Sequence, residues 1–504
     1  MAFQNAQHRS PDTVGLATRH LQNLRRRDFI VGAAFIDGRW LAGEQRGVVV
    51  DPATGREIAD VARCSAADMN LAIAAAERSF AVWRQVLPAK RGAILRSWAS
   101  LMLDHSEELA ILVTSEQGKP LAEARSEIAY GAGFLEWFAA EGERAYGETI
   151  PSHQLGSLLQ VRMQPIGVAA AVTPWNFPVA MITRKAGAAL AAGCPIIVKP
   201  APETPLSALA VARLAEEAGV PPGVFQVVVG DQVELSAPLL RDTRIRALSF
   251  TGSTEVGRVL LRGAADTVKK MSLELGGHAP FIIFDDVDLL KAVKGAMAAK
   301  FATSGQDCLA ANRIYVQRGI YNAFVEAFAA ETIRLNVGHG LEPATDIGPM
   351  TKLSVAEKCK LHIDDAMARG ARAFSAKQSH GLGHNFVLPT LLSEVTEDML
   401  IAHEETFGPV AAVLPFDSEE EVLTRANASE MGLAAYVYTD SVRRALRVSE
   451  NIDFGMVGIN TASFTGPPIP FGGWKQSGLG REGSRHGMEE FMELKYVCFG
   501  DLAA

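Results

Sequence analysis

A regular alternation of short apolar runs with helical segments, from about residue 166 to residue 285, constrains the fold most strongly. Residues 166–172 are apolar and lie between Pro165 and the turn residues Thr173-Pro174, so they predict a strand. A Gly/Ala-rich segment follows, which predicts a helix ending near Gly193. The apolar run at residues 195–198 then predicts a second strand, buried on both faces.

The alternation continues with the same spacing. Pro205 opens a predicted helix that stops at Gly219, which is the usual placement of proline and glycine at helix ends. Further strands are predicted at residues 225–229 and 247–250, each followed by a helical segment. Repeated strand–helix units of this length predict an α/β fold with a doubly wound parallel sheet. Its ligand should bind at the carboxyl ends of the strands.

The rest of the chain predicts a helical region and a second lobe. Ser65 with Asp68 is typical of a helix cap, and Ala and Leu dominate from there to about residue 140. A second strand–helix alternation begins with the apolar residues 281–284 and runs to about residue 475. A chain of 504 residues is long enough for two or three lobes, and two lobes imply a cleft between them.

The composition is that of a globular chain, and it argues against membrane and nucleic-acid partners. Hydrophobic residues make up 48% and charged residues 21%, and no apolar run reaches the roughly 18 residues of a membrane span. The formal net charge is −8, and the one dense basic cluster, residues 25–27, is followed by Asp28. Residues 1–28 lack an apolar segment of signal-peptide length. A transit peptide is an alternative for these residues, and we expect a cytoplasmic protein.

The cysteines favour a reduced protein without a structural metal. They are five in number, widely spaced, at Cys64, Cys194, Cys308, Cys359 and Cys498. A large chain does not need disulfides for stability, and an odd number argues against a full set of pairs. No Cys or His pair has the spacing of zinc ligands, so no metal site is predicted.

One segment predicts an anion site at the start of a helix. Residues 250–257 read Phe-Thr-Gly-Ser-Thr-Glu-Val-Gly, which places Gly252 and Ser253 where a strand turns into a helix. The segment does not fit a nucleotide triphosphate loop, because Arg258-Val259 stands where that loop needs Lys and then Ser or Thr. A plain packing turn explains the segment equally well when it is taken alone.

Six segments read together resemble the aldehyde dehydrogenase superfamily, in its order, between about residue 30 and residue 500. They are Thr173-Pro174-Trp175-Asn176-Phe177-Pro178, Ile197-Val198-Lys199-Pro200, Leu273-Glu274-Leu275-Gly276-Gly277, Gly305-Gln306-Asp307-Cys308, Glu404-Glu405-Thr406-Phe407-Gly408-Pro409 and Pro470-Phe471-Gly472-Gly473. The resemblance implies NAD(P)⁺-dependent oxidation of a small-molecule aldehyde to a carboxylic acid.

The resemblance also implies a division of the chain and a homo-oligomer. After an N-terminal arm (1–34), a Rossmann-like NAD(P)-binding domain comprises residues 35–146 and 166–276, and an α/β catalytic domain comprises residues 277–476. A small β oligomerisation element combines a hairpin at residues 147–165 with residues 485–504. A homodimer or homotetramer is the habit of the family.

The catalytic residues implied by the resemblance suit aldehyde chemistry. Cys308 is the nucleophile, because a thiolate adds to an aldehyde to give a thiohemiacetal and then a thioester. Asn176 donates its side-chain N–H to the oxyanion, a contribution of about 3–4 kcal/mol. Glu274 removes a proton from the water that attacks the thioester, and its apolar neighbours should raise its pKa. Lys185 and Glu482 match positions that assist the nucleophile and proton movement.

The cofactor is NAD or NADP. Lys199 matches the residue at the adenosine ribose, Ser253 the one near the pyrophosphate, and Glu405 with Phe407 the pair at the nicotinamide ribose. The full predicted set is Thr173, Pro174, Trp175, Lys199, Pro202, Gly252, Ser253, Gly257, Leu275, Glu405 and Phe407. Strict NAD⁺ enzymes often have Glu where Pro202 stands, which favours use of NADP⁺ as well, although Glu203 beside it is acidic.

Among the subfamilies, the overall pattern of this sequence most resembles that of the succinate-semialdehyde dehydrogenases. Arg184 matches one of its carboxylate-binding arginines, but Ala302 replaces the second. The Ser expected in the C-terminal loop is absent from residues 464–469. These two departures put succinate semialdehyde in doubt.

Asp307 before the nucleophile instead resembles the Gly-Gln-Asp-Cys segment of gamma-aminobutyraldehyde dehydrogenases, where a carboxylate would favour a substrate ammonium group. Arg184 and Asp307 could also pair with each other. A neutral pocket lined by Phe177 and Phe464 would then take uncharged aldehydes. These substrate alternatives stay open.

Two other function classes fit the sequence less well. A binding or structural protein on this fold would be expected to have lost Cys308 or Glu274, and both are present. A relative that releases coenzyme A esters would lack the deacylating base, so Glu274 favours hydrolysis.

Overall fold

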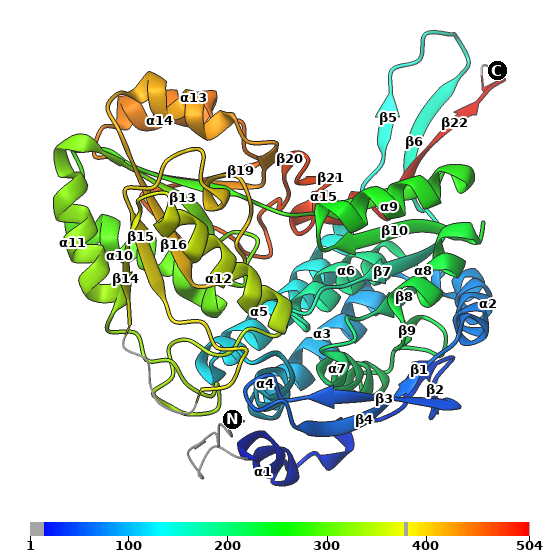
Figure 1. Cartoon of the computed structure of the whole chain (residues 1–504). Coiled ribbons are helices and arrows are strands. Elements are labelled where there is room, and N and C mark those ends of the chain that lie inside the picture. The colour runs from blue at the N-terminus through cyan, green and yellow to red at the C-terminus, as the bar shows by residue number, and fades with distance from the viewer. Residues whose placement is uncertain (1–14, 377–381, 503–504) are drawn as a thin grey trace.

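The computed structural model describes residues 15–376 and 382–502, and two large sheets organise them (Figure 1). The first part of the predicted N-terminal arm, residues 1–14, lies outside the described residues. Its remainder forms α1 (Leu16–Gln22) and a 3₁₀ turn (Arg27–Phe29). The side chains of Leu21 in α1 and Phe29 in the turn are buried. The described part of this segment therefore packs onto the protein body.

The first sheet has eight strands. In spatial order they are β2 (Arg39–Leu41), β1 (Ala34–Ile36), β9 (Phe225–Val227), β8 (Ile196–Lys199), β7 (Val168–Val172), β10 (Ile245–Thr251), β11 (Lys270–Glu274) and β21 (Gly478–Leu479). The five strands from β9 to β11 pair in parallel, whereas β1 and β21 pair antiparallel at the two sides. The four strands predicted from the alternation are confirmed, with ends that differ by one or two residues.

Helices cover both faces of this sheet. They are α2 (Ala66–Trp83), α3 (Pro88–Asp104), α4 (Ser106–Gln117), α5 (Leu121–Glu141), α6 (Ala180–Ala192), α7 (Pro205–Glu217), α8 (Gln232–Arg241) and α9 (Thr254–Ala264). Alternate residues of β7 enter two different cores, because side chains along a strand point to opposite faces. Ala169 and Ala171 pack with α3 and α5–α7, whereas Val168, Ala170 and Val172 pack with α2, α8 and α9.

The helix ends agree with the sequence signals. Ser65 and Asp68 form the predicted capping box, in which each side chain accepts from the other's backbone N–H, and α2 begins at the next residue, Ala66. Pro205 is the first residue of α7. Gly193 ends α6 in the left-handed conformation with φ 99°, which glycine adopts without steric cost.

The second sheet has seven strands. In spatial order they are β14 (Arg372–Ser375), β15 (Thr390–Ser393), β16 (Val410–Phe416), β13 (Ala311–Gln317), β12 (Ala279–Ile283), β18 (Ala434–Tyr438) and β19 (Met456–Ile459). All neighbours pair in parallel except β14 and β15. Its helices are α10 (Leu289–Phe301), α11 (Tyr321–Thr332), α12 (Leu353–Ala368), α13 (Glu419–Asn427) and α14 (Val442–Asn451).

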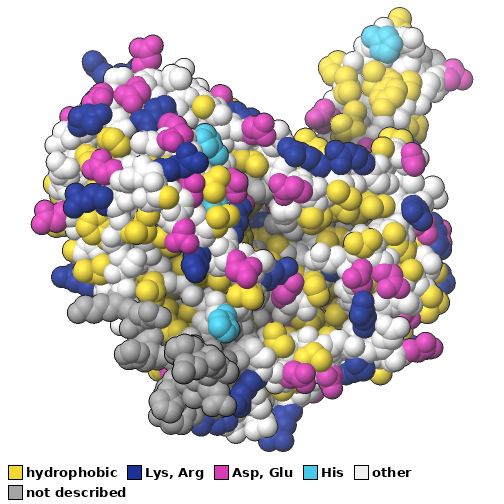
Figure 2. All heavy atoms as spheres, viewed as in Figure 1, with side chains coloured by type: hydrophobic (Ala, Val, Ile, Leu, Met, Phe, Trp, Pro, Cys, Tyr) yellow, Lys and Arg dark blue, Asp and Glu magenta, His cyan; other side chains and the backbone are white. Residues whose placement is uncertain are grey.

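A third, three-stranded sheet projects from the body beside α9 (Figure 1). Its strands are β5 (Glu148–Ile150), β6 (Leu158–Pro165) and β22 (Met492–Phe499), with β6 in the middle. Exposed apolar side chains gather on it, as Figure 2 shows, and they include Leu155, Leu494 and Tyr496. Within the described residues, no helix is both long and apolar enough to cross a membrane.

Candidate active site

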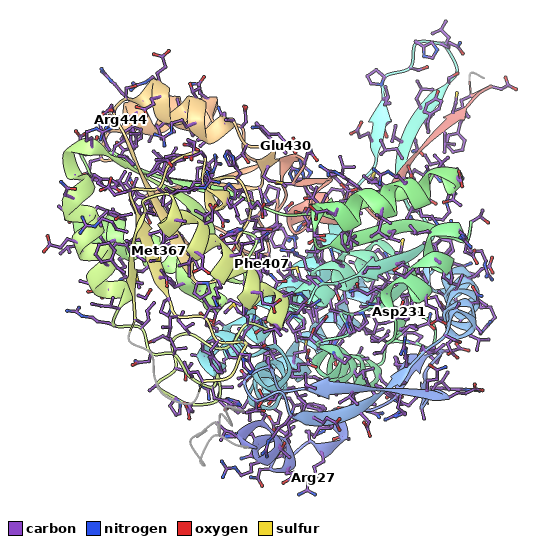
Figure 3. All side chains as sticks on the ribbon, viewed as in Figure 1. Arg27, Asp231, Met367, Phe407, Glu430 and Arg444 are labelled. Carbon is purple, nitrogen blue, oxygen red and sulfur yellow. The ribbon has the colours of Figure 1, made fainter. Side chains whose placement is uncertain are left out.

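The carboxyl ends of four parallel strands bring predicted cofactor and catalytic residues to one edge of the first sheet. Thr173 follows β7, Lys199 ends β8, Ser253 follows β10 and Glu274 ends β11. The second lobe contributes the loop that contains Phe407, which lies between the two lobes in Figure 3. The site is therefore built where the lobes meet.

A cavity of about 240 Å³, which we call the cofactor cavity, lies at this edge. The predicted residues that line it are Pro174, Trp175, Asn176, Gly252, Ser253, Leu275, Cys308, Glu405 and Phe407. Sequence reasoning missed its other lining residues, which are Met181, Thr251, Gly276, Val355 and Lys358. The rings of Trp175 and Phe407 meet edge to face, with centroids 5.4 Å apart. Thr173, Lys199, Pro202 and Gly257 are not among the lining residues of this cavity.

The start of α9 has the features of an anion site. Ser253 is its N-cap, and its Oγ accepts a hydrogen bond from the backbone N–H of Val256 at 3.4 Å. Gly257 packs against Leu275 so closely that a Cβ atom on Gly257 would lie 2.5 Å from Leu275 Cδ2. The glycine thus lets α9 approach the cavity wall, with its positive helix end toward the site.

Lys199 is a buried cation without a partner. Its side chain is fully buried, and within the described residues its Nζ has no hydrogen-bond partner. Burial lowers the pKa of Lys199 to about 8. Nearby, Glu203 forms an ion pair with Lys352 at 2.5 Å. A polar ligand that supplies acceptor oxygens, such as a ribose or phosphate, fits this orphaned ammonium group.

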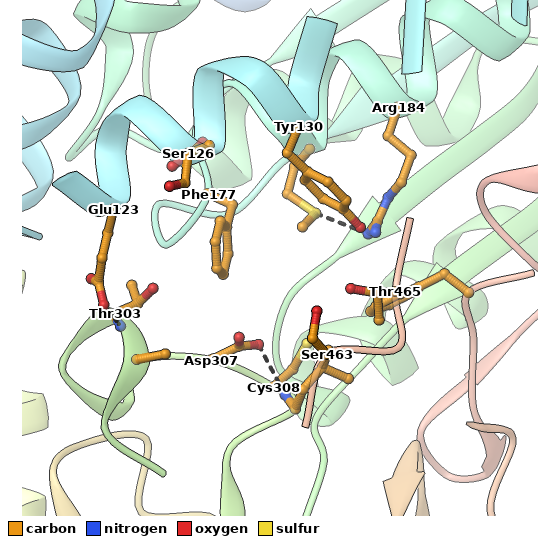
Figure 4. Close-up of a pocket in the computed structure, with 15 residues that line it drawn as sticks. Glu123, Ser126, Tyr130, Phe177, Arg184, Thr303, Asp307, Cys308, Ser463 and Thr465 are labelled. Atoms are coloured by element: carbon orange, nitrogen blue, oxygen red, sulfur yellow. Dashed lines mark hydrogen bonds between the residues drawn. The ribbon is translucent and has the colours of Figure 1, made fainter. Parts of the chain in front are cut away.

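A second cavity of about 430 Å³ lies beside the nucleophile, and we call it the substrate cavity (Figure 4). Cys308 and Met181 line both this cavity and the cofactor cavity. The Cys308 thiol therefore lies at the junction of two cavities and is only partly buried. A reactive cysteine requires this placement, whereas Cys64, Cys194 and Cys359 are buried in the cores.

A strained loop presents the nucleophile. Thr303, Ser304 and Gly305 are all in the left-handed conformation, with φ of 52°, 55° and 72°. A Cβ atom on Gly305 would lie 2.3 Å from the carbonyl oxygen of Gly408, so only glycine fits there. Gln306 anchors the loop, since its Oε1 accepts from the Thr351 N–H at 2.9 Å.

Asn176 is held next to this loop. Its Nδ2 donates to the carbonyl oxygen of Gln306 at 3.0 Å, and its own carbonyl accepts from Lys119 Nζ at 2.7 Å. The Lys119 ammonium also forms a buried ion pair with Glu127 at 2.7 Å and lies 3.9 Å from the centre of the Phe177 ring. This network fixes the segment that contains both Asn176 and Phe177.

The electrostatics of Cys308 and Glu274 disfavour their charged forms. Burial, and then the charges of Asp307 and Glu405, raise the pKa of Cys308 well above its usual range. Burial, and then the charge of Glu482, raise the pKa of Glu274, as the sequence predicted. Within the described residues neither carboxylate oxygen of Glu274 has a hydrogen-bond partner. Glu274 does not line either cavity itself.

A buried cluster contradicts one of the alternatives left open by the sequence, in which Arg184 pairs with Asp307. Arg184 Nε instead forms an ion pair with Glu482 Oε2 at 2.6 Å, and Lys185 Nζ pairs with the other oxygen of the same carboxylate. Figure 4 shows Arg184 beside Tyr130, across the cavity from Asp307. Asp307 Oδ1 accepts from the backbone N–H of Leu309 at 2.9 Å, which holds it in the nucleophile loop. The neutral pocket built on an Arg184–Asp307 pair is therefore wrong.

The C-terminal loop brings a second correction. Phe464 does not line the substrate cavity, because its ring packs edge to face against Tyr436 with centroids 5.3 Å apart. Its neighbours Ser463 and Thr465 line the cavity instead (Figure 4). The loop therefore supplies two hydroxyl groups, although the expected Ser is absent from residues 464–469. Phe177, Arg184 and Asp307 do line the cavity as predicted.

One wall of the substrate cavity was missed in the sequence. It is α5, whose Glu123, Ser126, Glu127 and Tyr130 line the cavity. These residues recur at intervals of three or four along an Ala-rich helix, a polar stripe that could have indicated a functional face. The Thr303 N–H donates to both carboxylate oxygens of Glu123, and burial raises the pKa of Glu123 to about 7.

Comparisons with known proteins agree with this geometry. The 3-sulfolactaldehyde dehydrogenase of Pseudomonas putida is 51% identical, over 93% of this chain and 96% of its own. The succinate-semialdehyde dehydrogenase (NADP⁺) of Escherichia coli is 50% identical, over 93% of this chain and 97% of its own. A crystal structure of succinate-semialdehyde dehydrogenase from Burkholderia pseudomallei superposes with a TM-score of 0.94 at 48% identity, covering 95% of this chain and 100% of that one. The model of the aldehyde dehydrogenase family matches residues 40–497, and this chain belongs to that family.

Proposed function

We propose that the protein oxidises a small aldehyde that carries an acidic group to the carboxylic acid, with NAD⁺ or NADP⁺ as oxidant and Cys308 as nucleophile. The observation that carries this proposal is the position of Cys308, which lines both the cofactor cavity and the substrate cavity. An aldehyde bound on one side of the thiol can thus pass its hydride to the other side.

The residues of this chain supply the steps around that transfer. The Cys308 thiol gives its proton to solvent and the sulfur bonds to the carbonyl carbon, while the Asn176 side chain and the Cys308 backbone N–H donate to the oxyanion. A nicotinamide ring held in the cofactor cavity would supply the hydride acceptor, and loss of the hydride leaves a thioester on Cys308. Glu274 then takes a proton from water and the hydroxide adds to the thioester carbonyl. The C–S bond breaks, the acid leaves, and the proton held by Glu274 returns to the sulfur to restore the thiol.

The charge of the buried cluster supports an anionic substrate. Arg184 and Lys185 bring two positive charges to the single carboxylate of Glu482, whose pKa is lowered by both cations despite its burial. Burial lowers the pKa of Lys185, whereas the charge of Glu482 raises the pKa of Arg184 despite its burial, so the guanidinium is the lasting positive charge of the cluster. The two relatives named above act on aldehydes with a sulfonate or a carboxylate group. The Arg184 guanidinium and the hydroxyls of Ser463 and Thr465 are suitable donors for such a group.

An ω-aminoaldehyde is a second candidate, favoured by the acidic residues of the substrate cavity. Asp307 and Glu123 both line it, and either carboxylate could bind an ammonium group. Steady-state formation of reduced cofactor with succinate semialdehyde, gamma-aminobutyraldehyde and butanal, with and without coenzyme A, separates the candidates. A preference for gamma-aminobutyraldehyde would reject the acidic substrate, and a requirement for coenzyme A would reject hydrolysis.

Replacing Arg184 with Gln should lower kcat/KM for succinate semialdehyde by about tenfold more than for butanal, a loss of about 1.4 kcal/mol in binding the acidic group. Arg184→Lys keeps the charge and should recover part of this selectivity. Equal losses on both aldehydes in the Gln variant would show that Arg184 only supports the fold around Glu482.

We expect NADP⁺ to be used about as well as NAD⁺, because Lys352 neutralises the one acidic side chain next to Pro202. Lys352→Gln frees the Glu203 carboxylate to repel a 2′-phosphate, and should lower the NADP⁺/NAD⁺ ratio of kcat/KM about tenfold. Calorimetric dissociation constants for both cofactors check the same ratio without turnover. A wild-type enzyme that uses NADP⁺ about a thousandfold less well than NAD⁺ would contradict this prediction.

We also propose a homo-oligomer in the cytoplasm, built from the domains that the family resemblance implies. Most strands of the three sheets lie within the bounds 35–146 with 166–276, 277–476, and 147–165 with 485–504. The exceptions are β1, which begins at Ala34, and β21, which joins the first sheet from residues 478–479. The projecting sheet supports the oligomer, because β22 pairs only with β6 in the described residues and its outer edge is open.

Light scattering should therefore give a mass of two or four times 54.0 kDa. Replacing both Leu494 and Tyr496 with Asp places charges on one face of β22, where these side chains are 71% and 55% exposed, and should shift the mass toward the monomer. Val82→Asp, at an exposed position on α2, is the matched control. An unchanged mass in the double variant would remove this sheet from the interface.

A further inference from the structure

A third cavity adjoins the substrate cavity. It has a volume of about 570 Å³, and we call it the outer cavity. It shares lining residues with the substrate cavity, and these are Ala302, Asp307, Leu309, Ser463 and Thr465. The two cavities adjoin at these five residues, and Cys308 lines the substrate cavity.

Small residues on one face of α10 leave room for the outer cavity. Gly295, Ala298 and Ala299 line it, and Ala302 continues the same face just after the helix. The Tyr438 hydroxyl fills the space beside Gly295, where a Cβ atom would lie 2.1 Å from it. Any long side chain at position 302 would enter the junction of the two cavities, so Ala302 keeps the passage open.

Two lysines line the far end of the outer cavity. Lys291 and Lys294 are three residues apart on α10, and both are exposed. Neither lysine has an ion-pair partner among the residues that the structure describes. Both lie in the first turns of α10, whose N-terminal N–H groups are already capped by the Asp288 carboxylate, so the attraction for an anion comes from the two ammonium groups. This end of the outer cavity therefore attracts an anion, whereas Asp307, where the two cavities adjoin, repels one.

We infer that the outer cavity extends the substrate site and binds the distal anion of an aldehyde longer than a four-carbon semialdehyde. Lys291 and Lys294 bind the distal carboxylate or other anion, and the chain between passes over the Ala-lined face of α10. At about 1.5 Å per helical residue, Lys294 lies roughly 12 Å along the helix direction from Ala302, so only a long chain reaches it. This inference rests on the proposed aldehyde oxidation and names a further substrate class for the same site.

The test measures kcat/KM for ω-carboxy aldehydes of four, six, eight, ten and twelve carbons and for the unsubstituted aldehydes of equal length. In the wild-type enzyme, the ratio of acidic to neutral aldehyde should rise again at the longer lengths. The double variant Lys291→Gln with Lys294→Gln should lower this ratio at least tenfold for the longer chains. Lys360→Gln removes an exposed lysine from α12, outside all three cavities, and should behave as wild type.

Calorimetry with the corresponding long dicarboxylic acids gives a second readout that needs no turnover. These acids should bind the wild-type enzyme at least tenfold more tightly than the double variant. Equal ratios in the wild type and the double variant, or equal losses on long neutral aldehydes, would overturn the role of the lysines. Absence of turnover with every aldehyde in the wild type would instead reject the proposed function, so the two failures are distinguishable.

Discussion

Replacing Cys308 with Ala should abolish aldehyde oxidation, by about 10⁴-fold or more, while binding of NAD(P)⁺ stays nearly intact. The thioester cannot form without the sulfur, and no other described cysteine lines the two cavities at this point. The side chain is small and partly exposed, so its loss should leave the fold unchanged. Cofactor reduction gives the rate, and fluorescence titration gives cofactor affinity.

Cys498→Ala is the matched control, because this thiol is exposed on β22, away from both cavities. It should keep the wild-type rate. More than a trace of turnover in the Cys308 variant would remove Cys308 from the role of nucleophile.

Glu274→Gln should retain a first-turnover burst of reduced cofactor but lose steady-state turnover by about 10²–10⁴-fold, since the thioester forms and its hydrolysis stalls. Rapid mixing measures the burst. An absent burst with an equally slow first turnover would assign Glu274 to an earlier step.

The pH dependence of deacylation provides a further check on Glu274. A general base acts in its deprotonated form, and burial raises the pKa of this carboxylate. Deacylation in the wild-type enzyme should therefore speed up as the pH rises through that raised pKa. The residual deacylation of the Gln variant should lack this step, because the amide does not titrate.

The fold could be predicted because its signals are local. Each central strand of the first sheet is a short apolar run between turn residues, and the helices carry their own signals, such as the Ser65 cap and Pro205. The cofactor cavity was largely predictable as well, since its residues lie in short segments just after parallel strands.

The substrate cavity was harder to predict because its contacts join distant parts of the chain. The partner of Arg184 proved to be Glu482, from a segment near the C-terminus, rather than Asp307 beside the nucleophile. The Phe464 ring packs against Tyr436. Its direction could not be predicted, because a loop without regular structure has no periodicity that assigns a side chain to one face. The sequence shows the polar residues of α5 as a stripe on one face of a helix, but it does not show that this face lines the substrate cavity.

The projecting sheet has a practical consequence for recombinant work. Strand β22 leads the chain along β6 and out of the protein body, so a purification tag or fluorescent protein fused after residue 504 would emerge beside the exposed apolar side chains of this sheet (Figure 1). Such a fusion would crowd the surface through which we expect subunits to associate. Helix α1 lies on the opposite side of the molecule, so a fusion upstream of it leaves that surface clear.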